Sequence, residues 1–292
     1  IDNIRPGKNL FKLFELTGKK KYRKAMDTVY SQLKTMPRTL EGNFWHKKIY
    51  PYQVWLDGLY MAQPFYMEYE TKYNRMRFCI DSFSQFENVE RIMKDTKTGL
   101  YYHGYDESRK SLWCDKKTGL SKNFWLRSIG WFILSLVDTA LAIDESLYYE
   151  FRRLQEMLYN LANDLLKFQD ESGMFYQLVD RKGDKDNYLE TSGSALISYA
   201  FLKAARNKLL PKRFEDYGRK IFDGILERYL CVEGEELSLG GICLVAGLGG
   251  KENRDGSAEY YYSEPVVKNE AKGVAPLLMA YTEIIRLGMV ND

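Results

Sequence analysis

The chain of 292 residues is long enough to bury a large hydrophobic core. Its 43 lysine and arginine residues nearly balance its 40 aspartate and glutamate residues, and the basic residues are scattered, which argues against a nucleic-acid-binding protein. No apolar run of about 18 residues occurs, so a membrane-spanning helix is not predicted and no membrane partner is expected.

Amphipathic stretches with a helical period follow one another along the chain. Gly18 stands between the first two and is expected to end one helix in a left-handed conformation before the next begins. No linker rich in serine, glycine or proline interrupts the series, which favours a single all-α domain over residues 1–292. The predicted helices are 8–16, 20–35, 54–69, 73–93, 123–142, 146–168, 190–206, 212–228 and 270–286.

Two parts of the chain resemble each other. The segment DTKTGLYYHGYD (95–106) matches DESGMFYQLVD (170–180), and NFWLRSIGWFIL (123–134) matches NYLETSGSALIS (187–198). Repeated helical hairpins form either an open solenoid or a closed toroid, and the long segments between the pairs favour a toroid with a rim around a central cavity. In this alignment His103, Trp125, Arg127 and Trp131 face Gln177, Leu189, Thr191 and Ala195, so we expect the functional groups on the side of the first copy.

Asp57 is the only acid within the largely apolar stretch PYQVWLDGLYMAQPF (51–65). Removing a carboxylate from water costs several kcal/mol unless it is paired or takes up a proton. Asp57 is therefore either satisfied by its neighbours or held ready to transfer a proton. An acid that caps the backbone amides of a first helical turn is an equally good interpretation of this stretch alone.

Two further stretches carry candidate side chains. His103 in YYHGYDES is one of only two histidines and has Asp106 nearby to pair with it, so a hydrogen-bonded structural histidine is the simpler interpretation. The stretch FWLRSIGW (124–131) combines Trp125, Arg127 and Trp131. Tryptophan stacks on sugars and arginine binds carboxylates through two parallel hydrogen bonds, so the set suits an acidic sugar. Two core tryptophans and a surface arginine fit the same spacing.

Several kinds of site are not indicated. The cysteines 79, 114, 231 and 243 have none of the paired spacings of zinc or redox motifs, which predicts no metal site and favours reduced thiols in a reducing compartment. The stretch GLGG (247–250) lacks the lysine of a phosphate-binding loop, and no Gly-x-Ser-x-Gly motif occurs. We therefore predict no cofactor, no nucleotide chemistry and no serine nucleophile.

Six motifs together are similar to glycoside hydrolase family 105, the unsaturated rhamnogalacturonyl hydrolases, and match them in order over nearly the whole chain. The resemblance implies an (α/α)6 barrel that removes a 4,5-unsaturated uronic acid from the non-reducing end of an oligosaccharide. Family members carry several tens of residues before the first motif, so we expect either that an N-terminal segment precedes the given sequence or that the chain forms an incomplete ring without the first helices. The motifs are IDNIRPGKNLFKLFELTGKKKY, VWLDGLYMAQPF, YYHGYDE, FWLRSIGW, NYLETSGSA and YYYSEPVVKNEAKGVAPLLMAY.

The resemblance implies roles for individual residues. Asp57 matches the general acid/base in the Trp-x-Asp motif, and Asp2 in IDN matches a second active-site aspartate. Tyr105 stands where a tryptophan is frequent, and Ser128 with Ile129 replaces the commoner small residue and asparagine, so the pocket is expected to differ in shape. The predicted substrate-binding residues are His103, Trp125, Arg127, Trp131, Trp55 and His46.

The implied reaction hydrates a vinyl ether and needs a protonated Asp57, whose pKa is expected to be raised by aromatic walls and by Asp2. The expected substrate is unsaturated galacturonyl-rhamnose from pectin, in the cytoplasm or periplasm of a bacterium; an unsaturated glucuronyl substrate is the alternative. A toroid that binds oligosaccharides without catalysis is a further alternative. A sugar epimerase of the same fold is disfavoured, because only His46 and His103 could shuttle protons.

Overall fold

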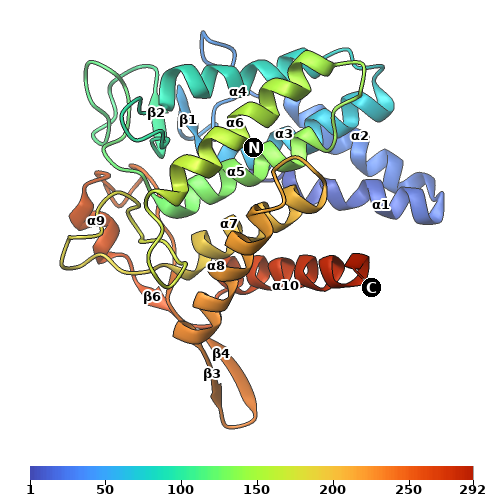
Figure 1. The fold of residues 1–292 in the computed structure, drawn as a ribbon. Coiled ribbons are helices and arrows are strands. Elements are labelled where there is room, and N and C mark those ends of the chain that lie inside the picture. Colours follow the sequence, from blue (N-terminus) through green and yellow to red (C-terminus); the bar gives the residue numbers. More distant parts are fainter. Residues whose placement is uncertain (292) are drawn as a thin grey trace.

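The computed structural model describes residues 1–291, which are mostly helical (Figure 1). Each of the nine predicted helices has a counterpart, and Gly18 ends the first at φ 61°, as expected. The six-residue α9 was not predicted, because it is too short to show a helical period. The helices are α1 (Lys8–Thr17), α2 (Lys20–Lys34), α3 (Leu56–Tyr73), α4 (Cys79–Met93), α5 (Leu126–Ala140), α6 (Tyr148–Leu166), α7 (Thr191–Arg206), α8 (Phe214–Tyr229), α9 (Ala258–Ser263) and α10 (Ala271–Asn291), with a 3-10 turn η1 (Arg5–Gly7) before α1.

One helix boundary was predicted wrongly. The stretch 73–93 was expected to be one helix, but α3 continues to Tyr73 and α4 begins only at Cys79. Buried Glu70 organises the turn between them, because its carboxylate accepts hydrogen bonds from the side chain of Asn74 and from the backbone N–H of Phe78. These hydrogen bonds depend on polar groups, and apolar periodicity does not reveal them.

Six short strands form three antiparallel pairs. The pair β1–β2 joins Val54 to Tyr105 and Trp55 to Gly104, and so connects the residues before α3 with the His103 segment. The β3–β4 hairpin projects from the helices at the bottom of Figure 1. The strands are β1 (Gln53–Trp55), β2 (Gly104–Asp106), β3 (Leu230–Glu233), β4 (Glu236–Leu239), β5 (Ile242–Cys243) and β6 (Val266–Val267).

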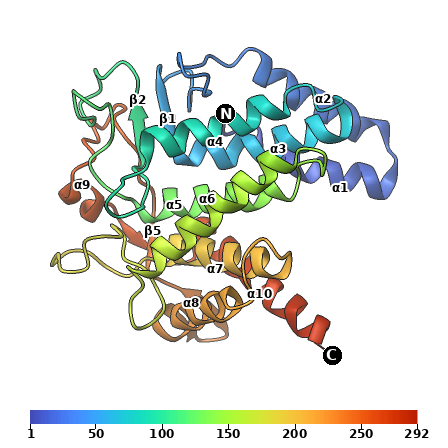
Figure 2. The ribbon, with the colours of Figure 1, turned by 45° about the horizontal axis from the view of Figure 1, so that its top comes forward.

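The helices are arranged in two layers. Helices α3, α5, α7 and α10 pack side by side in chain order, and α4, α6 and α8 each pack outside the preceding member of that row (Figure 2). Helices α5 and α7 are buried along almost their whole length, whereas α6 and α8 each bury a single apolar stripe. This alternation of inner and outer helices is the hairpin order of the predicted all-α toroid.

Glycines allow the inner helices α5 and α7 to approach closely. A Cβ atom on Gly193 would lie 2.4 Å from Cγ of Leu126, and one on Gly130 would lie 2.9 Å from Cβ of Leu196. Both distances are too short for carbon atoms, so larger residues would push the helices apart. The starts of α5 and α7 are thereby held next to each other.

The internal repeat has a structural counterpart at the starts of the inner helices. The backbone N–H of Leu56, at the start of α3, donates to the carbonyl of His103 at 3.1 Å. At the start of α5, the N–H of Leu126 donates to the carbonyl of Gln177 at 3.0 Å. His103 and Gln177 therefore hold equivalent places, as the alignment of the two copies predicts.

Three of the four cysteines have the burial expected of structural thiols. Cys79, Cys114 and Cys243 are buried, whereas Cys231 is exposed. None of the helices within residues 1–291 is long and apolar enough to cross a lipid bilayer.

Candidate active site

The candidate residues gather where the inner helices begin. Loops that carry β1, β2, β6 and α9 lie together at this end of the helices, on the left of Figure 1. Asp57 lies in the first turn of α3 and Arg127 in the first turn of α5. Because β1 pairs with β2, the residue before Gly104 is placed beside the start of α3. The sequence prediction that Asp57, His103 and the FWLRSIGW residues form one region is consistent with this arrangement.

Asp57 and His103 face each other. The Oδ2 atom of Asp57 lies 3.5 Å from Nε2 of His103, which is beyond good hydrogen-bond length but within ion-pair range. His103 is fully buried, whereas 17% of the Asp57 side chain is exposed. Neither Oδ2 nor Nε2 has a hydrogen-bond partner within the described residues. A carboxylate that is only partly satisfied is a candidate for proton transfer.

The expectation of a raised pKa for Asp57 is wrong. Burial acts to raise the pKa of Asp57, but the neighbouring His103 and His46 together bring it below its ordinary value. Asp2, which was expected to raise it, is instead directed to other partners. Asp57 is therefore ionised at neutral pH when no ligand is bound.

Asp2 lies beside His46 and Lys47. Its Oδ2 atom is 2.8 Å from Nζ of Lys47, its Oδ1 atom is 4.0 Å from Nε2 of His46, and 44% of its side chain is exposed. His46 is buried, and its Nδ1 atom would lie 3.3 Å from a Cβ atom on Gly58, the residue after Asp57. His46 thus lies near both carboxylates, and burial lowers its pKa to about 4, so that the ring is neutral at pH 7.

Two of the predicted tryptophans pack against His103. Trp55 stacks on His46 at 4.3 Å between ring centroids and meets His103 edge-on at 5.4 Å. Trp125 lies on another side of His103, at 4.7 Å. Both indoles are almost completely buried. They hold the imidazole in place and surround it with apolar surface.

Arg127 lies against the ring of Trp125 and is 1% exposed. Its guanidinium carbon is 4.9 Å from the centroid of the Trp125 ring. The Nη1 atom donates to the hydroxyl of Ser192 at 3.0 Å and to the carbonyl of Cys243 at 2.6 Å. The Nη2 atom is also buried but has no hydrogen-bond partner within the described residues. A buried cation with a free donor can bind an anion.

Trp131 is half-buried one turn further along α5 than Arg127. Its ring stacks on Tyr60 of α3 at 4.8 Å. Tyr60 in turn accepts a hydrogen bond from Arg5, whose guanidinium lies over the Tyr60 ring. Trp131 therefore lies between α3 and α5, about one helical turn further from the start of α5 than Arg127.

Sequence reasoning assigned the wrong partner to His103 and missed another. Asp106 does not contact the imidazole; its carboxylate accepts hydrogen bonds from the backbone of Ser108 and Ser111. The partner of Nδ1 is the hydroxyl of Tyr261, at 2.7 Å. Tyr261 lies 158 residues along the chain from His103. The only sequence signal for it was its place in the last of the six motifs.

A second missed residue is Gln177, which accepts a hydrogen bond from the indole N–H of Trp125 at 3.2 Å. It was noticed only as the counterpart of His103 in the second copy. The repeat could have suggested that this place on the rim holds a functional neighbour in both copies.

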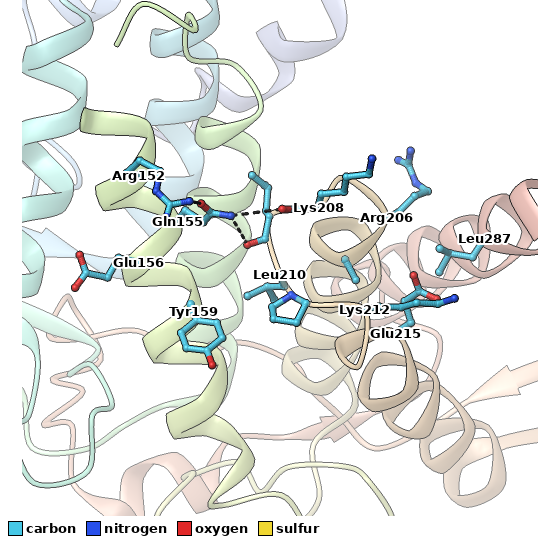
Figure 3. A pocket seen from close by; sticks show the side chains of 13 residues that line it. Arg152, Gln155, Glu156, Tyr159, Arg206, Lys208, Leu210, Lys212, Glu215 and Leu287 are labelled. Atoms are coloured by element: carbon cyan, nitrogen blue, oxygen red, sulfur yellow. Dashed lines mark hydrogen bonds between the residues drawn. The ribbon is translucent and has the colours of Figure 1, made fainter. Parts of the chain in front are cut away.

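Two of the surface pockets differ in their position relative to Asp57. One of about 480 Å³ is lined by Asp2 and Lys47, beside the start of the chain. Another, of about 780 Å³, lies on the outside between α6 and the loop that follows α7 (Figure 3). The second is remote from Asp57, because it lies beyond the C-terminal end of α7, whereas Asp57 is at the N-terminal end of α3. Within residues 1–291 no group of three acidic, histidine or cysteine side chains is placed to hold a metal ion.

Two known proteins match most of this chain. Protein Atu3128 of Agrobacterium fabrum is 39% identical over 235 residues, which is 78% of this chain and 99% of the relative. The unsaturated rhamnogalacturonyl hydrolase YesR of Bacillus subtilis is 30% identical over 233 residues, covering 78% of this chain and 64% of YesR.

A solved structure and a family model extend the match to almost the whole chain. The structure of a family 105 glycoside hydrolase from C. acetobutylicum superposes with a TM-score of 0.90 at 43% identity, covering 95% of this chain and 77% of that one. The model of Glycosyl Hydrolase Family 88 matches residues 1–288. The chain therefore belongs to Glycosyl Hydrolase Family 88 and is a glycoside hydrolase of the helical toroid fold, related to the enzymes of family 105.

Proposed function

We propose that the protein removes a 4,5-unsaturated uronic acid from the non-reducing end of an oligosaccharide, with Asp57 as the acid and base. The strongest support is Asp57 itself: a partly buried carboxylate at the start of an inner helix, paired with one histidine and with no hydrogen-bond partner for Oδ2 within the described residues. A group of this kind can donate a proton and take one back.

The proposed reaction begins with protonation of the double bond. Asp57 donates its proton to C4 of the sugar, the C4–C5 π bond supplies the electron pair, and positive charge develops at C5 and the ring oxygen. The carboxylate of Asp57 then takes a proton from water as its oxygen bonds to C5. The resulting hemiketal breaks its bond between C5 and the ring oxygen, and its hydroxyl proton passes to that oxygen, which leaves a ketone at C5 and a hemiacetal at C1. The hemiacetal then collapses to an aldehyde as the glycosidic bond breaks, and its proton passes to the glycosidic oxygen, which leaves as a hydroxyl group of the second sugar. Asp57 ends the cycle protonated, as it began.

Arg127 is the proposed partner of the uronate carboxylate. Its Nη2 atom is buried and without a hydrogen-bond partner within the described residues, while Nη1 is anchored to Ser192 and to the backbone at Cys243. An anchored guanidinium with a free donor supports binding of an anion and disfavours binding of a neutral sugar. Trp55, Trp125 and Trp131 are the proposed apolar walls of the sugar pocket.

The charge of the substrate offers a way to protonate Asp57. A uronate bound nearby excludes water and adds a negative charge, and both effects raise the pKa of a carboxyl group. The acid would then be ionised in the free enzyme and protonated in the complex. Asp2 is proposed to hold the water or the proton together with His46, which lies near both carboxylates.

The leaving sugar is proposed to be rhamnose, with unsaturated galacturonyl-rhamnose as substrate. The support is the 30% identity to YesR, which is named an unsaturated rhamnogalacturonyl hydrolase. Unsaturated glucuronyl oligosaccharides are the second candidate, because they present the same ring to Asp57 and differ mainly in the leaving sugar.

The test is turnover of lyase-generated disaccharides, followed by loss of the ultraviolet absorbance of the double bond. We expect loss of absorbance with release of rhamnose from the pectin disaccharide. A protein that only binds sugars would leave the absorbance unchanged. A kcat/KM more than about tenfold higher for glucuronyl substrates, equivalent to about 1.4 kcal/mol, would overturn the choice of rhamnose while keeping the chemistry.

A further inference from the structure

His103 has a polar neighbour at each nitrogen of its ring. Its Nδ1 atom lies 2.7 Å from the hydroxyl of Tyr261, and its Nε2 atom lies 3.5 Å from Oδ2 of Asp57. His103 and Tyr261 are both fully buried. The three side chains come from the segment before β2, from α9 and from α3, so they form a connected line across three parts of the rim.

The direction of the Tyr261 hydrogen bond can be deduced from the donors that are present. A neutral imidazole carries one N–H, and the other nitrogen accepts. Burial raises the pKa of Tyr261 well above its ordinary value, so the phenol keeps its proton. Within the described residues that hydroxyl has no hydrogen-bond partner other than Nδ1 of His103. The phenol therefore donates to Nδ1, and the imidazole proton is left on Nε2, which faces Asp57.

We propose that Tyr261 is a positioning residue that fixes His103 in its Nε2–H tautomer and thereby presents an N–H group to the Asp57 carboxylate. In the other tautomer a lone pair on Nε2 would face the carboxylate, and the two acceptors would repel each other. The consequence for catalysis rests on the proposed role of Asp57, but the tautomer itself does not.

Among the described neighbours of the imidazole, Tyr261 is the one that hydrogen-bonds to Nδ1. Trp55 and Trp125 contact the ring with their aromatic surfaces, at centroid distances of 5.4 Å and 4.7 Å. The titratable groups that face His103 are Asp57 and Tyr261, and His46 lies beyond Trp55. Tyr261 keeps its own position through ring stacking on Trp125 at 6.1 Å. Removing its hydroxyl should consequently leave the ring in place.

The experiment exploits the two histidines of the chain. In the whole protein labelled with ¹⁵N-histidine, His46 and His103 give two imidazole spin systems, and His46→Gln assigns the remaining one to His103. We expect the neutral imidazole of wild-type His103 to carry its proton on Nε2. Tyr261→Phe should populate the Nδ1–H tautomer. The matched control is Tyr260→Phe, because the Tyr260 hydroxyl accepts from the N–H of Gly247 and does not contact His103.

The outcomes separate this inference from the proposed function. A wild-type His103 with its proton on Nδ1, or a tautomer unchanged by Tyr261→Phe, would overturn the role of Tyr261 whatever the protein hydrolyses. A changed tautomer with kcat reduced about tenfold or more and KM little altered would support it fully. A changed tautomer in a protein that never consumes an unsaturated uronide would keep the contact and reject the proposed chemistry.

Discussion

The Oδ2 atom of Asp57 lies 3.5 Å from Nε2 of His103, and neither atom has a hydrogen-bond partner among the described residues. Buried polar atoms without partners are uncommon, since each costs about 1–3 kcal/mol. His103 is therefore close enough to affect the pKa of Asp57. Because Oδ2 has no hydrogen-bond partner among the described residues, Asp57 can still exchange a proton with a third group.

Asp57→Asn should reduce kcat by about two to four orders of magnitude, the usual contribution of a general acid or base. Asparagine keeps the shape and hydrogen bonding of the side chain but cannot donate and recover a proton. Substrate binding should change little, because the carboxylate of the sugar is assigned to Arg127. Both quantities follow from steady-state kinetics with the unsaturated disaccharide and from calorimetric titration.

The matched control for this substitution is Asp115→Asn, a carboxylate in the exposed DKKTG turn far along the chain from α3. It should keep wild-type kcat. If Asp57→Asn retained activity within about threefold, the acid would have to be another residue, with Asp2 as the next candidate.

The pH profiles of kcat and kcat/KM should differ on their alkaline sides. The profile of kcat/KM reports the free enzyme, in which the pKa of Asp57 is below its ordinary value. The profile of kcat reports the complex, in which the bound uronate raises that pKa. The alkaline fall of kcat should accordingly occur at higher pH than that of kcat/KM. Coincident limbs would show that substrate binding does not protonate Asp57.

Arg127→Ala should weaken binding of the unsaturated uronide by about 2–3 kcal/mol, as expected for a lost charge-assisted hydrogen bond. The substitution also removes the donor to Ser192 and to the Cys243 carbonyl, so folding must be checked by thermal unfolding. Ser192→Ala is the control: it removes one anchor of the guanidinium and keeps the charge. Equal losses of affinity in the two variants would argue that position, and not charge, is what Arg127 contributes.

The helices could be predicted from the sequence because apolar periodicity indicates which faces are buried. It also located Asp57 and Arg127, since an acid in an apolar stretch and an arginine between tryptophans stand out against their neighbours. The residues that complete the site do not stand out. Tyr261 is one tyrosine among 23, and only the packing of α9 against the start of α5 brings it to His103.

The direction of the Asp57 pKa shift could not be predicted for a related reason. The aromatic neighbours in the sequence suggested desolvation, which raises the pKa of an acid. The two histidines that reverse the shift come from the separate segments around 46 and 103, and their approach depends on the β1–β2 pairing and on the loop before β1. A pKa is set by neighbours in space, and those were not visible in the chain order.

His46 predicts how stability depends on pH. Burial lowers its pKa from 6.5 to about 4, so the folded protein binds a proton there less readily than the unfolded chain does. This contribution to stability is complete above pH 6.5 and is lost as the pH falls towards 4, by up to about 3 kcal/mol.

Because other groups titrate in the same range, the quantity to measure is the difference in unfolding free energy between wild type and His46→Gln, obtained from urea titrations at several pH values. That difference should shift against the wild type by about 3 kcal/mol between pH 7 and pH 4. Parallel pH curves for the two proteins would mean that His46 is not held neutral by burial beside Asp57 and Asp2.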